Sequence, residues 1–201
     1  MNKIILSGML RDVQHSHNIG NVSFNKANLI VKRDSGQEDI INLRFKSFSN
    51  KYKDNDNISL VGNVRSYSYK VSEDKNKVTI YVFTYFDEPS VEELTSENKA
   101  EIDGRICKMN PVRELSNGKH NLHFIVANNL MSSDGSKRLN SYIPCIAWGK
   151  LARELGELKI NTKIELIGEL RSREHKKVHE DGEVEFRVAH ELLVTDYKVV
   201  E

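Results

Sequence analysis

Several segments of this 201-residue sequence carry both aromatic rings and positively charged side chains. Together these two kinds of side chain can bind a flexible polyanion. Residues 41–48 read INLRFKSF, and the alternation of a β-strand places Arg44, Lys46 and Phe48 on one face. Such cations contact phosphates, and the face of an aromatic ring accepts any nucleobase. The segment therefore predicts a surface for a single nucleic-acid strand. The alternative is a solvated sheet face that ends in one exposed ring.

A second strand-like segment, residues 141–148 (SYIPCIAW), carries the only tryptophan of the chain. Alternation puts Tyr142 and Trp148 on one face, where their rings could stack on bases. The opposite face carries apolar side chains that suit the lining of a barrel: Ile143, Cys145 and Ala147. Tyr and Trp are also favoured where protein packs on protein, so packing under a loop, against a helix or at a subunit interface is the alternative.

Two further segments, residues 64–70 and 170–177, repeat the same chemistry. Their candidate binding residues are Arg65, Tyr67 and Tyr69 in the first segment and Arg171, Arg173, His175, Lys176 and Lys177 in the second. A charged hairpin taken singly is most often only a solvated surface. The recurrence of these side chains at matching places in the chain favours a binding surface.

The elements that must position these side chains occur twice along the chain. Each half offers five short strand signals in the same order, and two glycines of each half anchor the alignment: Gly8 with Gly104, and Gly62 with Gly168. Leucines at helical spacing in residues 149–158 predict a helix between strands three and four of the second half, where the first half has a polar loop. This is the layout of the OB fold, a small antiparallel barrel.

We therefore expect an all-β protein of two tandem five-stranded OB-fold barrels, the second with a helix between strands 3 and 4. Residues 1–87 form the first predicted domain and residues 99–201 the second. Residues 88–98 are acidic and polar and contain Pro89, so they are predicted to be a linker.

The second half resembles the bacterial and phage single-stranded DNA-binding protein family. The resemblance rests on NPVRELSNGKHNLHFIVAN, YIPCIAWGKLARE and IELIGELRSREHKK, which agree with that family in order, spacing and residue type over nearly the whole half. The first half matches through NKIILSGML, LVGNVRSYSY and its strand pattern. The resemblance implies the OB fold and binding of single-stranded DNA by base stacking.

The resemblance also implies roles for particular residues. Tyr142 and Trp148 fall on aromatic stacking positions of the third strand, and Tyr69 and His175 fall on a third such position. In the first half we align Asn42 with Tyr142 and Phe48 with Trp148, so the first half departs from the pattern at one position. On this strand the second half carries more aromatic surface and the first more charge. We therefore expect the two halves to contribute unequally to binding.

Family members with two folds per chain further imply a homodimer that presents four OB folds. The family usually ends in a flexible tail with an acidic tip, whereas this sequence stops at TDYKVVE. Recruitment of protein partners through such a tail is therefore not expected.

The composition narrows the class of protein. The formal net charge is +1, so any polyanion must be held by local patches. No apolar run is long enough for a membrane helix and no signal peptide precedes Arg11, so the cytoplasm is predicted. Cys107 and Cys145 lie in apolar strand-like runs and are predicted to be buried free thiols. No metal-ligand spacing, cofactor motif or catalytic motif is present, so we expect neither a metal, nor a cofactor, nor an enzyme.

These patterns predict a protein that binds single-stranded DNA with little sequence preference and coats it in replication, recombination or repair, with RNA as a second possible polymer. The alternative is an OB-fold assembly factor of a replication or plasmid-maintenance complex. Such a factor would dock a protein partner through the aromatic strand, and its DNA binding would be weak or secondary.

Overall fold

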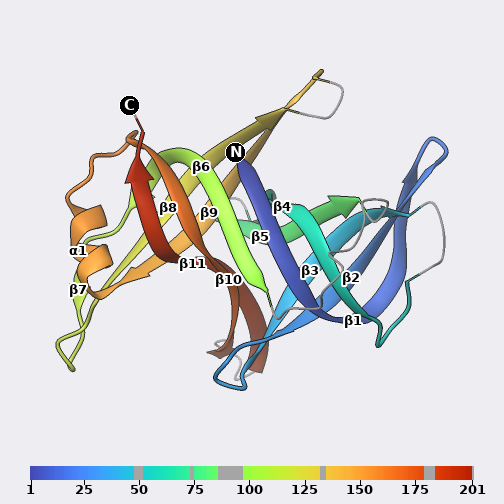
Figure 1. The fold of residues 1–201 in the computed structure, drawn as a ribbon, viewed down its shortest axis with the longest axis horizontal. Coiled ribbons are helices and arrows are strands. Elements are labelled where there is room, and N and C mark those ends of the chain that lie inside the picture. The colour runs from blue at the N-terminus through green and yellow to red at the C-terminus, as the bar shows by residue number, and fades with distance from the viewer. Residues whose placement is uncertain (48–51, 73–74, 86–96, 132–134, 179–183, 201) are drawn as a thin grey trace.

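The computed structural model describes residues 1–47, 52–72, 75–85, 97–131, 135–178 and 184–200, which form β-strands almost throughout (Figure 1). The elements in chain order are β1 (Asn2–Ile19), β2 (Val22–Lys32), β3 (Glu38–Ser47), β4 (Asn57–Ser72), β5 (Lys75–Tyr85), β6 (Asn98–Met109), β7 (Arg113–Glu114), β8 (His120–Met131), β9 (Arg138–Trp148), α1 (Gly149–Gly156), β10 (Lys163–Val178) and β11 (Val184–Val199). Most of the predicted linker, residues 88–98, lies outside the described residues, and β6 begins at Asn98.

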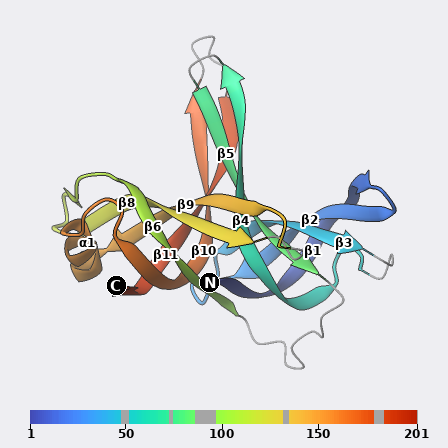
Figure 2. The same cartoon turned by 90° about the horizontal axis from the view of Figure 1, so that it is seen from above.

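The strands close into two barrels that follow each other along the chain (Figure 2). In barrel 1 the neighbours run β2, β3, β5, β4, β1, and β1 also pairs with β2, so the sheet closes on itself. In barrel 2 the order β6, β10, β11, β9, β8 closes in the same way through β6 and β8. The third and fifth strands are parallel in both barrels. The predicted fold class is confirmed, with α1 between β9 and β10 as the expected helix.

Glycines anchor the repeat as the sequence predicts. Gly8 lies opposite Ile58 across β1 and β4, and Gly104 lies opposite Ile164 across β6 and β10. At Gly8, as at Gly104, an added Cβ would collide with the backbone carbonyl of the second strand of its barrel. Only a residue without Cβ allows these strands to approach so closely. Gly62 and Gly168 occupy matching positions next to the fifth strand of each barrel.

The predicted alignment of the two third strands is wrong by two residues. Parallel pairing places Leu43 opposite Val82 in barrel 1 and Cys145 opposite Leu192 in barrel 2. Val82 lies two residues before the partner of Gly62, and Leu192 lies two residues before the partner of Gly168, so Leu43 and Cys145 are equivalent. The partners of Tyr142 and Trp148 are therefore Ile40 and Lys46, in place of Asn42 and Phe48. A slip of two residues keeps every side chain on its own face of the strand, so alternation alone could not reveal it.

The two barrels are joined through their first strands, because Asn2–Leu6 of β1 pairs antiparallel with Asn98–Ile102 of β6. At this junction the side chain of Asn2 donates to the carbonyl oxygen of Val64 (2.7 Å) and accepts from its N–H (2.8 Å). Asn98 makes the same pair of bonds with Leu170 in barrel 2. In each barrel the side-chain amide takes the place of a backbone hydrogen-bonding partner, at the point where the first strand separates from the fourth.

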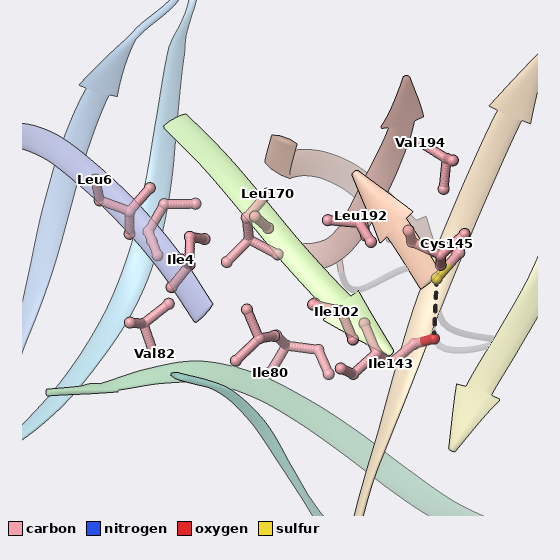
Figure 3. Close-up of a cluster of buried hydrophobic side chains, with 14 of the residues drawn as sticks. Ile4, Leu6, Ile80, Val82, Ile102, Ile143, Cys145, Leu170, Leu192 and Val194 are labelled. Atoms are coloured by element: carbon pink, nitrogen blue, oxygen red, sulfur yellow. Dashed lines mark hydrogen bonds between the residues drawn. The ribbon is translucent and has the colours of Figure 1, made fainter. Parts of the chain in front are cut away.

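The inward side chains of both barrels form one continuous hydrophobic cluster, part of which is drawn in Figure 3. Ile4 and Leu6 lie on the side of barrel 1, Ile143 and Leu192 lie on the side of barrel 2, and Ile102 lies between them. Helix α1 adds Ala152 and Leu155 to the cluster, and Leu155 is one of the leucines on which the helix was predicted.

The two cysteines differ in exposure. Cys145 is buried as predicted, whereas Cys107 is exposed, so the prediction of a buried thiol is wrong there. Ile102 and Ile106 are the buried side chains of this part of β6, so alternation places Cys107 on the opposite, outward face.

Candidate nucleic-acid interface

The outward side chains of β2 to β5 form a continuous surface of rings and cations, which we call the barrel-1 face. Its members are Phe24, Lys26, Arg44, Lys46, Arg65, Tyr67, Tyr69, Tyr81 and Phe83. The face gathers the predicted residues Arg44, Lys46, Arg65, Tyr67 and Tyr69. Sequence reasoning missed Phe24, Lys26, Tyr81 and Phe83. The signal for the last two is the alternation in VTIYVF, where Ile80 and Val82 are the buried set.

The tyrosines of the barrel-1 face lie in a cluster held by one arginine. The rings of Tyr67 and Tyr69 stack with centroids 5.8 Å apart, and both side chains are about 40% exposed. The guanidinium of Arg44 lies 5.3 Å from the Tyr67 ring and 5.2 Å from the Tyr81 ring. These cation–π contacts fix the rings while leaving ring surface accessible, which suits stacking on bases.

Arg65 lies flat on a second ring of the same face. Its guanidinium is 4.1 Å from the centroid of the Phe83 ring, and its buried Nε has no hydrogen-bond partner within the described part of the chain. Phe83 contacts Phe24, whose ring in turn stacks on His17 at 4.9 Å. A guanidinium held over a ring at the edge of such a face is suited to contact a phosphate beside a stacked base.

A groove of about 280 Å³ runs along the barrel-1 face. Its lining includes Lys26, Arg44, Tyr67 and Tyr81, together with Asp12, whose carboxylate accepts from Asn28 at 2.8 Å. The cations outnumber this single carboxylate, so the groove is electropositive although the whole chain is nearly neutral.

The corresponding surface of barrel 2, which we call the barrel-2 face, has a different composition. Its members are His123, Ile146, Trp148, Glu169, Arg171, Arg173, Glu191 and Leu193. Trp148 is 42% exposed, so its ring is accessible as predicted. Tyr142 is 49% exposed and lies near the middle of β9, where its N–H donates to Ser66 Oγ of barrel 1 at 2.7 Å.

A cavity of about 800 Å³ lies where the turn between β2 and β3 meets the barrel-2 face. Barrel 2 contributes Trp148, Arg171, Arg173 and Glu191 among others to its wall, and barrel 1 contributes Arg33, Asp34, Ser35, Gln37, Glu38 and Ile40. Cations and carboxylates are mixed in this wall, so it lacks the consistent positive charge of the barrel-1 groove.

Arg171 is already engaged by carboxylates. Its guanidinium donates to Asp39 Oδ2 at 3.1 Å and to Glu169. The Asp39 side chain is fully buried and also accepts from Arg33 and from the N–H of Ser172. Burial on its own raises the pKa of Asp39, but these hydrogen bonds outweigh it and leave the pKa below its ordinary value. Asp39 is therefore ionised at neutral pH and holds Arg171 in place.

Some predicted residues have no described side chain. Phe48 lies outside the described residues, and only the backbone of His175, Lys176 and Lys177 is described, within β10.

Two other classes of site were tested on the described residues. Within the described ranges, no group of three or more His, Cys, Asp or Glu side chains is placed to hold a metal ion. No helix in the described part of the chain is long and apolar enough to cross a membrane.

Comparisons with known proteins agree with this architecture. A model of the single-strand binding protein family matches residues 97–198. No curated protein matches the sequence. The crystal structure of the wild-type single-stranded DNA binding protein from Thermus aquaticus superposes with a TM-score of 0.73 at 16% identity, covering 100% of this chain and 93% of that chain. A deletion mutant of the same protein gives the same score and identity over 95% of its chain. At this identity, the structural matches show a shared fold over the whole length.

Proposed function

Because the chain belongs to the single-strand binding protein family, we propose that it binds single-stranded DNA with little sequence preference and coats the strand during replication, recombination or repair. The observation that carries the proposal is the barrel-1 face, where Arg44 lies on the accessible rings of Tyr67 and Tyr81, and Arg65 covers the buried ring of Phe83, beside an electropositive groove. Ring faces and cations without base-specific donors or acceptors suit binding that ignores sequence.

In this proposal the rings stack on bases and the cations contact the backbone. The stacking residues are Tyr67, Tyr69, Tyr81, Tyr142 and Trp148, and the backbone contacts are made by Lys26, Arg44, Lys46, Arg65 and Arg173. The resemblance to the family adds Phe48, His175, Lys176 and Lys177. Arg171 is left out, because its guanidinium already pairs with Asp39 and Glu169. Stacking contributes about 1 to 3 kcal/mol per base, so a few rings are enough for micromolar binding.

The organisation of the chain is part of the proposal. We assign residues 1–87 to one domain, 88–98 to a linker and 99–201 to the second domain. We further propose a homodimer that presents four OB folds, on the resemblance to family members with two folds per chain. Light scattering would give a mass twice the 23.1 kDa of the chain, and a monomer mass at micromolar concentration would contradict the dimer.

The function is tested by titrating the protein with oligo-dT. Because Trp148 is the only tryptophan and is exposed, its emission should be quenched on binding, and the anisotropy of a labelled oligonucleotide should rise. No change in either signal up to tens of micromolar protein at low salt would refute the proposal. Oligo-U is the matched polymer, and equal affinity for it would extend the ligand to single strands of RNA.

A further inference from the structure

Two contacts between the barrels are related by the internal repeat. The N–H of Ile40 in β3 donates to Ser172 Oγ in β10 at 2.8 Å. The N–H of Tyr142 in β9 donates to Ser66 Oγ in β4 at 2.7 Å. Ile40 and Tyr142 are partners in the aligned third strands, and Ser172 and Ser66 lie opposite His190 and Ile80 at matching registers. The molecule thus contains the same junction twice.

The two junctions differ in one side chain. The residue before Ile40 is Asp39, whereas the residue before Tyr142 is Ser141. Asp39 accepts from the Ser172 N–H at 2.6 Å, and Ser141 Oγ accepts from the Ser66 N–H at 3.4 Å. Both side chains therefore approach the same backbone group, but only one carries a negative charge.

That negative charge determines whether a nearby arginine is paired with a carboxylate. Arg171 precedes Ser172 and Arg65 precedes Ser66, so the two arginines are also partners in the repeat. Arg171 donates to Asp39, and Arg33 donates to the same carboxylate at 2.6 and 2.8 Å. Arg65 has no carboxylate within salt-bridge distance in the described part of the chain, and its guanidinium lies on Phe83 at the barrel-1 face.

We propose that Asp39 is a determinant of how the two barrels share single-stranded DNA, because its carboxylate takes the place of a phosphate on Arg171 and Arg33. The inference rests on the proposed function. Barrel 1 then binds the strand with Lys26, Arg44, Lys46 and Arg65, whereas the described side chains of the barrel-2 face that serve this purpose are Trp148 and Arg173. The cavity next to Arg171 remains open to a strand, but with less positive charge than its arginines would supply.

An internal carboxylate can outcompete a phosphate here because it is fixed and buried. The Asp39 side chain has no exposed surface and uses both oxygens for charge-assisted hydrogen bonds. Breaking the pair would leave an uncompensated charge in the junction, which is far more costly than releasing a mobile counterion. DNA therefore gains little by displacing Asp39.

The test exchanges the two residues that differ. Asp39→Ser gives the first junction the side chain of the second, removes the carboxylate that pairs with Arg33 and leaves Arg171 with Glu169 alone. Affinity for oligo-dT should rise on the order of fivefold, and the slope of log K against log salt should become steeper by about 0.7 for each new phosphate contact. In the double variant Asp39→Ser/Arg171→Gln the part of this gain due to Arg171 should disappear.

Ser141→Asp is the reciprocal variant, and it keeps the test decisive if Asp39→Ser fails to fold in a thermal melt. The new carboxylate is placed to pair with Arg65, so affinity should fall and the salt slope should flatten by about 0.7. Unchanged affinity and slope in a folded Asp39→Ser protein, a gain that survives fully in the double variant, or unchanged binding by Ser141→Asp would overturn the inference. Failure of the unmodified protein to bind oligo-dT would instead refute the proposed function.

Discussion

Barrel 1 and barrel 2 are built on the same scaffold but present different faces. In both, a glycine on the fourth strand packs against a carbonyl of the fifth strand, and an asparagine on the first strand continues the ladder. On the outward side, Arg65 lies opposite Tyr81 in barrel 1, whereas Arg171 lies opposite Glu191 in barrel 2. Lys46 in barrel 1 corresponds to Trp148 in barrel 2. The scaffold therefore fixes where an outward side chain stands, but not its chemistry.

The part of the chain that the family model matches is not the part that the proposed function makes the stronger surface. The family model covers residues 97–198, which belong to barrel 2. Among the described residues, the larger cluster of rings, with Arg44 and Arg65 over them and no salt bridge to either arginine, nevertheless lies on barrel 1. Because inward residues and glycines satisfy the geometry of the barrel, outward residues are free to differ. We therefore expect barrel 1 to be the main contact for the strand.

The largest effect is expected from removing one ring on each face. Tyr67→Ala should weaken binding of oligo-dT about tenfold or more, because the ring supplies stacking surface and also packs against Tyr69 and Arg44. Trp148→Ala should have a smaller effect, because Glu191 shares its cavity and Arg171 is occupied. Anisotropy of a labelled oligonucleotide measures both variants, since it does not depend on tryptophan.

Both rings are exposed, so neither substitution should change the melting temperature much. Tyr67→Phe is the control that keeps the ring and should bind nearly as tightly as the unmodified protein. A greater loss from Trp148→Ala than from Tyr67→Ala would reverse the comparison and make barrel 2 the main contact.

A smaller effect is expected from removing one cation on each face. Arg65→Gln should flatten the slope of log K against log salt by about 0.7, because one phosphate contact is lost. Arg171→Gln should leave the slope nearly unchanged, because Asp39 and Glu169 already neutralise that charge. Lys99→Gln is a matched control, since Lys99 lies on β6, outside both faces, and pairs with Glu101. Equal flattening by Arg65→Gln and Arg171→Gln would show that Arg171 also contacts the strand.

The fold and much of the barrel-1 face could be predicted from the sequence. Paired glycines and alternating strands recur in both halves, and these features are local enough to read directly. Arg44, Arg65, Tyr67 and Tyr69 were found because they alternate within single strands. Tyr81 and Phe83 carry the same alternation signal in their strand and were missed.

What could not be predicted depends on contacts between distant segments. Asp39 and Arg171 are far apart in sequence and meet only because the first strands of the two barrels pair. The slip in the third-strand alignment has a similar origin, because the register is set by parallel pairing with the fifth strand. Alternation reports which face a residue occupies, but not which residue of another strand stands beside it.

The smallest effect is expected from pH, and it should distinguish the two junctions. His190 and Ile80 occupy matching positions, and His190 Nε2 bonds to the Ile40 carbonyl at 2.7 Å. Burial lowers the pKa of His190, so the unfolded chain binds the proton more readily than the folded chain. The free energy of unfolding should therefore fall as pH drops below about 6.5, by at most about 1.4 kcal/mol per pH unit. Asp39, whose pKa is also lowered, keeps its contribution to stability until pH falls below the ordinary range of a carboxyl.

Urea unfolding at pH 7 and pH 5 should therefore show a smaller loss of unfolding free energy for His190→Gln than for the unmodified protein. The glutamine keeps a donor for the Ile40 carbonyl. An equal loss in both would assign the pH dependence to groups outside this junction.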